Sequence, residues 1–204
     1  MISHEHKFIF VHIPKCGGTS IESLFGGSVC GWDGDNNLWK QHYSINQIKS
    51  IYKIDIDKYY KFTFVRNPWD RAVSDYKWWI RRKSPFRHLL NNSTLKDYLL
   101  GRSGYEHINH LNNKTGGRGD HFYEQSSFIF VKNINKMDFI GRFENLQEDF
   151  NVVCDKIGIP RQELPHKNKT KHKHYTEYYD DETRQIVAEK YAKDIEYFGY
   201  KFGK

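Results

Sequence analysis

Short apolar runs that end at turn residues form the first pattern along the chain. The run FIFVHI at 8–13 stops at Pro14, and the run FTFV at 62–65 stops just before a second proline. Two shorter candidates follow, at 128–131 and 139–141. Runs of this kind are typical of strands buried on both faces. They predict a central, mostly parallel sheet.

Helical spacing appears between and after these runs. Apolar side chains recur three and four residues apart in three groups: Ala72, Tyr76 and Trp79; Leu146, Phe150, Val153 and Ile157; Val187, Tyr191, Ile195 and Phe198. Pro68 suits the first turn of the first helix, Gly158 ends the second, and Asp180 or Asp181 can cap the third.

One further helix is predicted at about 45–52, because Ser44 and Gln47 have the spacing of a capping box. Strand, loop and helix alternate along the chain, so the fold class is α/β, with the sheet flanked by helices. Two segments lack apolar periodicity: 101–121, rich in Gly, Asn and His, and the basic stretch 161–174. Within the basic stretch, residues 167–174 either form a solvated loop or close over an anionic ligand.

Length and composition narrow the class of protein. The 204 residues (24.4 kDa) suit a single domain over 1–204, and a mean hydropathy of −0.81 excludes a transmembrane span. Charged residues interrupt the first 15 residues too early for the apolar region of a signal peptide. We therefore expect a cytoplasmic protein. Three scattered cysteines indicate neither a disulfide scaffold nor a metal site. A net charge of +7 indicates an anionic partner: nucleic acid, a phosphorylated cofactor or an acidic polysaccharide.

The turn after the first strand, HIPKCGGTS, has the composition of an anion site. Gly17 and Gly18 allow close approach of the backbone, and the following helix presents free N–H groups. Lys15 adds a positive charge, and Thr19 and Ser20 add hydroxyl donors. The lysine precedes the glycines, whereas in a Walker A loop it follows them. The alternative is an ordinary strand–helix turn.

A second anion site is predicted at the end of the second strand. Arg66 lies at its carboxyl end, where open α/β sheets bind ligands, and Ser74 follows two helical turns later. Alternatively, Arg66 pairs with Asp70 and Ser74 is solvated. Two such sites together suggest a ligand with two separated anionic groups.

HIPKCGGTS paired with FTFVRNPWDRAVSDY resembles the sulfotransferases that use 3′-phosphoadenosine 5′-phosphosulfate (PAPS). The similarity is to the carbohydrate branch, which includes enzymes such as heparan sulfate 2-O-sulfotransferase. It continues through DFIGRFENLQEDF to DIEYFGYKF, over roughly 7–202. It implies a P-loop-like three-layer fold, PAPS as donor, adenosine 3′,5′-bisphosphate as product, and a carbohydrate or glycan hydroxyl as acceptor.

The resemblance also implies roles for individual residues. Those matching the loop for the 5′-phosphosulfate are Lys15, Cys16, Gly17, Gly18, Thr19 and Ser20, and those matching the 3′-phosphate pair are Arg66 and Ser74. His42 matches a general base, and Lys15 is the natural electrophile at the bridging oxygen. Lys169 and Thr170 fall where related enzymes place further cofactor contacts. Cys16 departs from the threonine common in the family.

Two neighbours of the predicted site are weaker candidates. His12 is predicted to be a hydrogen-bonded support at the strand end, and Glu22 is a second possible base. No metal is expected, because the chain has no suitable carboxylate pair or His/Cys spacing.

Two other functions agree with only part of the sequence. A kinase-like P-loop phosphoryl transferase would need a lysine after the glycines and an acidic magnesium ligand, and the sequence suggests neither. A nucleic-acid-binding domain rests on the basic charge alone, and no nucleic-acid module is recognisable, so no nucleic-acid partner is expected.

Overall fold

The computed structural model describes residues 1–25, 42–81, 90, 92–103, 105, 119–165 and 173–204. These residues belong to two compact units, each made from two separate stretches of chain. The first unit comprises 1–66 and 125–169, and the second comprises 67–124 and 170–204.

A four-stranded sheet forms the centre of the first unit. Its strands, in spatial order, are β1 (Ile2–Ser3), β2 (Phe8–Val11), β3 (Tyr60–Val65) and β6 (Phe139–Arg142). β2 pairs with β3 and β3 with β6 in parallel, and β1 adds an antiparallel edge strand. Every residue of β2 is buried. The central, mostly parallel sheet predicted from the apolar runs is therefore confirmed.

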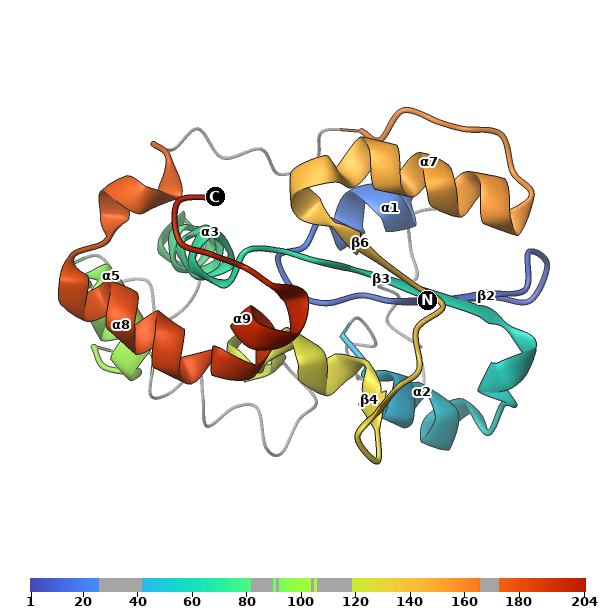
Figure 1. The fold of residues 1–204 in the computed structure, drawn as a ribbon, viewed down its shortest axis with the longest axis horizontal. Helices are drawn as coiled ribbons and strands as arrows, with labels where there is room; N and C mark the ends of the chain where they lie inside the picture. Colours follow the sequence, from blue (N-terminus) through green and yellow to red (C-terminus); the bar gives the residue numbers. More distant parts are fainter. Residues whose placement is uncertain (26–41, 82–89, 91, 104, 106–118, 166–172) are drawn as a thin grey trace. The chain divides into compact units, whose positions relative to one another are not determined.

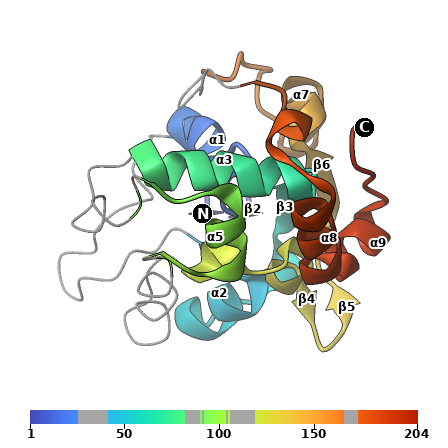
Figure 2. The same cartoon turned by 90° about the vertical axis from the view of Figure 1, so that its left-hand side faces the viewer.

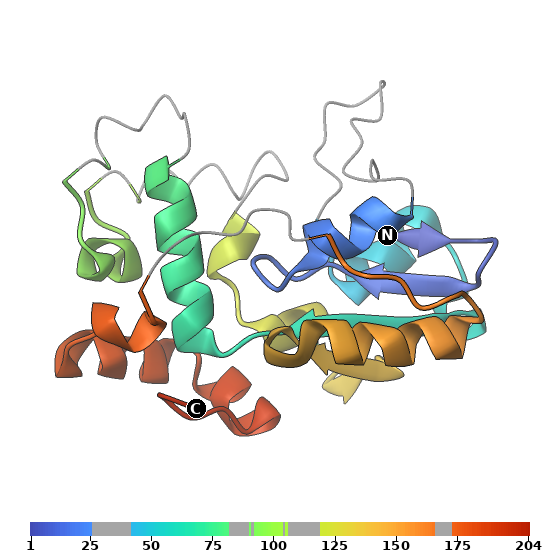
Figure 3. The same ribbon diagram turned by 90° about the horizontal axis from the view of Figure 1, so that it is seen from above.

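Helices cover both faces of this sheet. α1 (Gly18–Leu24) and α7 (Leu146–Ile157) lie on one face, and α2 (Ile45–Tyr52) lies on the other (Figure 1). Seen from above, α7 runs alongside β3 and β6, which it contacts (Figure 3). The first unit thus has three layers. Because β2 and β3 are parallel, the turns that follow their carboxyl ends emerge at one edge of the sheet.

The strand expected at 128–131 is only partly correct. Phe128 ends a short 3₁₀ helix, and only β4 (Phe130–Val131) is extended. It pairs with β5 (Ile134–Asn135) in a separate hairpin and not with the central sheet. Lys132 and Asn133 have φ values of 49° and 63°, as a two-residue turn of type I′ requires.

Short 3₁₀ helices connect several of these elements. They span Ile56–Lys58, Gly119–Phe122, Gln125–Phe128, Phe143–Asn145 and Tyr175–Tyr178.

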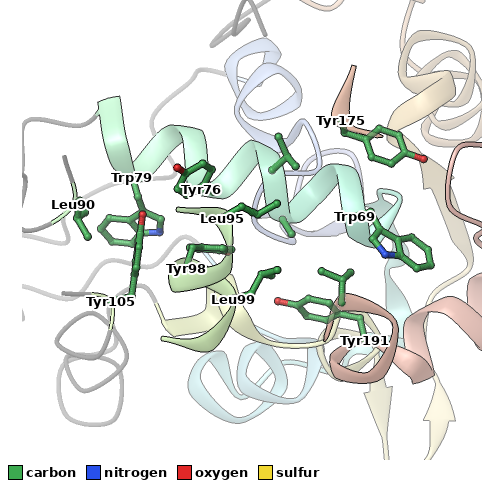
Figure 4. Close-up of a cluster of buried hydrophobic side chains, with 13 residues drawn as sticks. Trp69, Tyr76, Trp79, Leu90, Leu95, Tyr98, Leu99, Tyr105, Tyr175 and Tyr191 are labelled. Atoms are coloured by element: carbon green, nitrogen blue, oxygen red, sulfur yellow. The ribbon is translucent and has the colours of Figure 1, made fainter. Parts of the chain in front are cut away.

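The second unit is helical. α3 (Pro68–Arg81), α5 (Leu95–Leu100) and α8 (Asp181–Lys190) contact one another (Figure 2). They enclose a buried cluster rich in aromatic side chains (Figure 4). The labelled members are Trp69, Tyr76, Trp79, Leu90, Leu95, Tyr98, Leu99, Tyr105, Tyr175 and Tyr191.

The apolar stripe at the carboxyl end was predicted as one helix, but the structure divides it. α8 ends at Lys190 and α9 (Ala192–Phe198) follows, with Tyr191 between them at φ −116° and ψ 30°. Neither Pro nor Gly marks the break, so no sequence signal predicts it. The other end signals are confirmed: Asp180 caps α8, and Gly158 ends α7 in the left-handed conformation.

The capping box of α2 is confirmed in both directions. The backbone N–H of Gln47 donates to Ser44 Oγ, and the backbone N–H of Ser44 donates to Gln47 Oε1. His42 lies two residues before the cap, so the cap fixes the path of the chain next to the predicted base.

Replacement of the cap tests this local contribution. We expect Ser44→Ala to cost about 1 kcal/mol of unfolding free energy, because N–H groups of the first turn lose their acceptor. Thermal unfolding should show a fall of about 2–4 °C in Tm. Ser50→Ala, on the exposed side of the same helix, is the matched control and should change little. Equal Tm values of the two variants would contradict the assignment of Ser44 as the cap of α2.

Candidate functional site

The turn between β2 and α1 has an unusual backbone. Lys15 and Gly17 have φ values of 69° and 84°, while the φ of Cys16 between them is not positive. Backbone of alternating handedness points successive N–H groups toward one concave side. Within the described part of the chain, no side chain caps α1 at Gly17. Its first N–H groups can therefore serve an anion. A lysine in the left-handed region costs roughly 1 kcal/mol.

Both glycines of the turn are required by packing. A Cβ on Gly17 would lie 2.8 Å from Cδ2 of Leu146, at the start of α7. A Cβ on Gly18 would overlap the imidazole of His12. The two predicted glycines thus place the turn against α7 on one side and against His12 on the other.

Arg66 lies over this turn. Its Nη1 donates a hydrogen bond of 3.1 Å to the backbone oxygen of Lys15. Its guanidinium carbon stands 3.9 Å from the centre of the Phe143 ring, which is a cation–π contact. The guanidinium thus contacts both the turn and the ring. Arg66 and the backbone of Lys15, which follow two different strands, are therefore brought together.

Gln125 connects the ends of the two strands, and sequence reasoning missed it. Its Oε1 accepts from the Arg66 N–H at 2.8 Å and from Cys16 Sγ at 3.2 Å. Its Nε2 donates to the Arg66 carbonyl at 2.9 Å, and the residue is fully buried. The thiol of Cys16 also contacts the carbonyl of Pro14. The side chain of Cys16 therefore makes its contacts in the protein interior. This explains how cysteine can stand at a position where the resemblance implies threonine.

The predicted base, His42, lies beside His12. The two ring centres are 4.8 Å apart and the rings are nearly perpendicular, at 80°. On its other side His12 faces Glu22, with 3.0 Å between Nδ1 and Oε1. This approach does not have hydrogen-bond geometry: within the described residues, Nδ1 of His12 has no hydrogen-bond partner. The hydrogen bond expected at His12 is replaced by close contact with a carboxylate.

The remaining predicted residues have separate positions. Ser20 is buried in α1 and Thr19 is exposed. Ser74 is buried in α3 of the second unit, so its pairing with Arg66 stays a prediction. Lys169 and Thr170 lie outside the described residues.

Asp75, next to Ser74, is the centre of a buried polar cluster in the second unit. Its carboxylate lies 2.6 Å from Nδ1 of His121 and accepts hydrogen bonds from Tyr98 Oη and Trp79 Nε1. Burial, together with the charge of Asp75, raises the pKa of Tyr98 well above its usual value. The cluster secures the 3₁₀ helix at Gly119–Phe122 to α3.

Comparison with known proteins identifies the class. The chain belongs to the sulfotransferase family, whose model matches residues 1–201. It is 26% identical over 218 residues to carbohydrate sulfotransferase 9 of Homo sapiens, covering 95% of this chain and 47% of that protein. It is 21% identical over 233 residues to carbohydrate sulfotransferase 14 of Danio rerio, covering 98% and 61%. An uncharacterized protein of Archaeoglobus fulgidus is 29% identical over 106 residues, covering 52% and 73%.

The chain thus spans 47% and 61% of the lengths of the two carbohydrate sulfotransferases it matches. In the part of the chain that the structure describes, no helix combines the length and apolar character needed to cross a membrane.

Removal of the Gln125 amide should lower the stability of the protein. In Gln125→Ala, buried backbone groups of Arg66 lose their partners, and we expect a loss of about 2–4 kcal/mol in unfolding free energy. Chemical denaturation measures it. Gln185→Ala removes a glutamine from an exposed position on α8 and should stay within about 0.5 kcal/mol of the parent. A Gln125→Ala protein as stable as the control would show that the bridge contributes nothing.

Proposed function

We propose that this protein transfers a sulfuryl group from PAPS to a hydroxyl of a carbohydrate or glycan. The observation that carries the proposal is the turn at 15–18, with the Arg66 guanidinium bonded to it and two imidazoles beside it. Membership of the sulfotransferase family supports the reaction. Two matched relatives bear the name carbohydrate sulfotransferase, which supports a sugar acceptor.

The donor groups of the site fit a doubly anionic substrate. Lys15 and the first N–H groups of α1 suit the phosphosulfate end, because a helix start and a point charge both favour an anion. Arg66 offers a planar fork suited to phosphate oxygens. We assign the 3′-phosphate to Arg66 together with Ser74, and further contacts to Lys169 and Thr170.

The reaction needs proton removal, charge stabilisation and alignment. The acceptor oxygen attacks sulfur in line, a new S–O bond forms, and the S–O bond to the phosphate breaks. His42 accepts the proton that the acceptor hydroxyl loses. Lys15 balances the negative charge that develops on the leaving phosphate oxygen. The backbone of the turn holds the phosphate and sulfuryl oxygens in place.

The cytoplasmic location expected from the sequence stays a prediction. Localisation of the tagged full-length protein in its host is the measurement that decides it.

The proposed activity is tested with labelled PAPS and a panel of glycans. We expect a sulfated glycan and binding of adenosine 3′,5′-bisphosphate by calorimetry. No sulfated product on any acceptor, together with no affinity for the bisphosphate, would refute the proposal. Magnesium-dependent hydrolysis of ATP would favour the kinase-like alternative.

The two catalytic roles are tested by substitution. We expect Lys15→Met and His42→Ala to lower kcat by at least about 10²-fold, because each removes a group acting in the transition state. His42→Ala should still bind adenosine 3′,5′-bisphosphate. Lys49→Met, on α2, removes a lysine from an exposed position and is the control for loss of charge. Full activity of His42→Ala would exclude it as the base.

Substitution of Arg66 should act on binding more than on turnover. We expect Arg66→Ala to weaken binding of adenosine 3′,5′-bisphosphate by about 10- to 100-fold, the cost of one charge-assisted hydrogen bond. Calorimetry with the folded variant measures the dissociation constant. An unchanged constant would remove Arg66 from the cofactor site.

A further inference from the structure

We propose that Glu22 and His12 are positioning residues that set the orientation and charge of His42. The inference rests on the proposed function, in which His42 is the base. It concerns residues that touch His42 or its neighbour and that have no assigned part in holding PAPS.

Three surfaces hold the ring of His12. Phe10, two residues earlier on the same side of β2, stacks on it with ring centres 5.7 Å apart and 17° between the planes. Gly18 lies so close that any side chain there would overlap the ring. His42 meets it edge to face at 4.8 Å. A ring held in this way fixes the position of the imidazole that it touches.

The negative charge beside His12 comes from Glu22. The side chains of Glu22 and His12 are both 4% exposed, and Oε1 stands 3.0 Å from Nδ1. At this distance, and in a buried setting, water screens the field of the carboxylate at the ring only weakly.

The two imidazoles lie close enough for a charge on one ring to act on the other. A proton taken from the acceptor by His42 adds positive charge beside His12, and the carboxylate behind His12 stabilises it. Among the described residues, the titratable groups in contact with His12 are Glu22 from α1 and His42 before α2. The Glu22 carboxylate therefore favours the positively charged form of His42.

The first experiment follows the titration of His42 by NMR, without any substrate. Its Hε1 resonance is assigned among the 11 histidines by its loss in His42→Ala. In Glu22→Gln we expect the midpoint of this resonance to fall by about one pH unit, since a nearby negative charge is removed. Glu148→Gln makes the same change at an exposed position of α7 and should leave the midpoint unchanged. Equal midpoints in the two variants would overturn the proposal.

A second pair of variants covers the possibility that Glu22→Gln does not fold. Glu22→Asp keeps the charge and should keep the midpoint. His12→Asn removes the ring between the carboxylate and His42, and the midpoint should change. Binding of adenosine 3′,5′-bisphosphate reports that each variant is folded. An unchanged midpoint in folded His12→Asn would overturn the proposal as well.

Kinetics separate positioning from a general structural effect. We expect Glu22→Gln to lower kcat by about 10-fold or more with little change in the KM for PAPS, because the turn that holds PAPS is intact. A rise in KM with kcat unchanged would contradict the positioning role. If the titration shifts but the parent protein sulfates no acceptor, the coupling of the residues stands and the proposed function fails.

Discussion

One buried amide, that of Gln125, links the turn at 15–18 to the end of β3. Parallel pairing of β2 and β3 brings their carboxyl ends to the same edge of the sheet, but pairing alone leaves the following turns undetermined. The amide bonds to the backbone of Arg66 in both directions and accepts from the thiol of Cys16. Since it is fully buried, no water competes for these bonds. The geometry of Lys15 and Arg66 depends on this bridge.

Features encoded by neighbouring residues were predictable from the sequence. The capping box at Ser44, the cap at Asp180, the stop at Gly158 and the buried runs of β2 and β3 each need only a few adjacent positions. The turn at 15–18 between a buried strand and a helix was predictable in the same way, and its binding of an anion stays a prediction. Local spacing therefore predicted most of the elements of the first unit.

Features created by distant contacts were not predictable. The hydrogen bond between Gln125 and Arg66 joins positions 59 residues apart in the chain, and no local pattern around either residue predicts it. The apolar run at 128–131 predicted a strand of the central sheet, whereas β4 pairs only with β5. Apolar composition does not reveal which strand is the pairing partner. The contact of His12 with His42 likewise requires two elements to come together, and it became visible only in the structure.

Some conflicts between local preference and observed structure lie at the candidate site. Lys15 adopts a backbone conformation that glycine would adopt at lower cost, and Nδ1 of His12 is buried with no hydrogen-bond partner among the described residues. Replacement of buried polar pairs by well-packed apolar residues is often neutral or stabilising in proteins, so stability alone does not account for the contact of Glu22 with His12. Local violations with no gain in stability are expected where chemistry is performed. The strained backbone of Lys15 and the buried imidazole of His12 therefore lie in the same short segment as the two glycines of the turn.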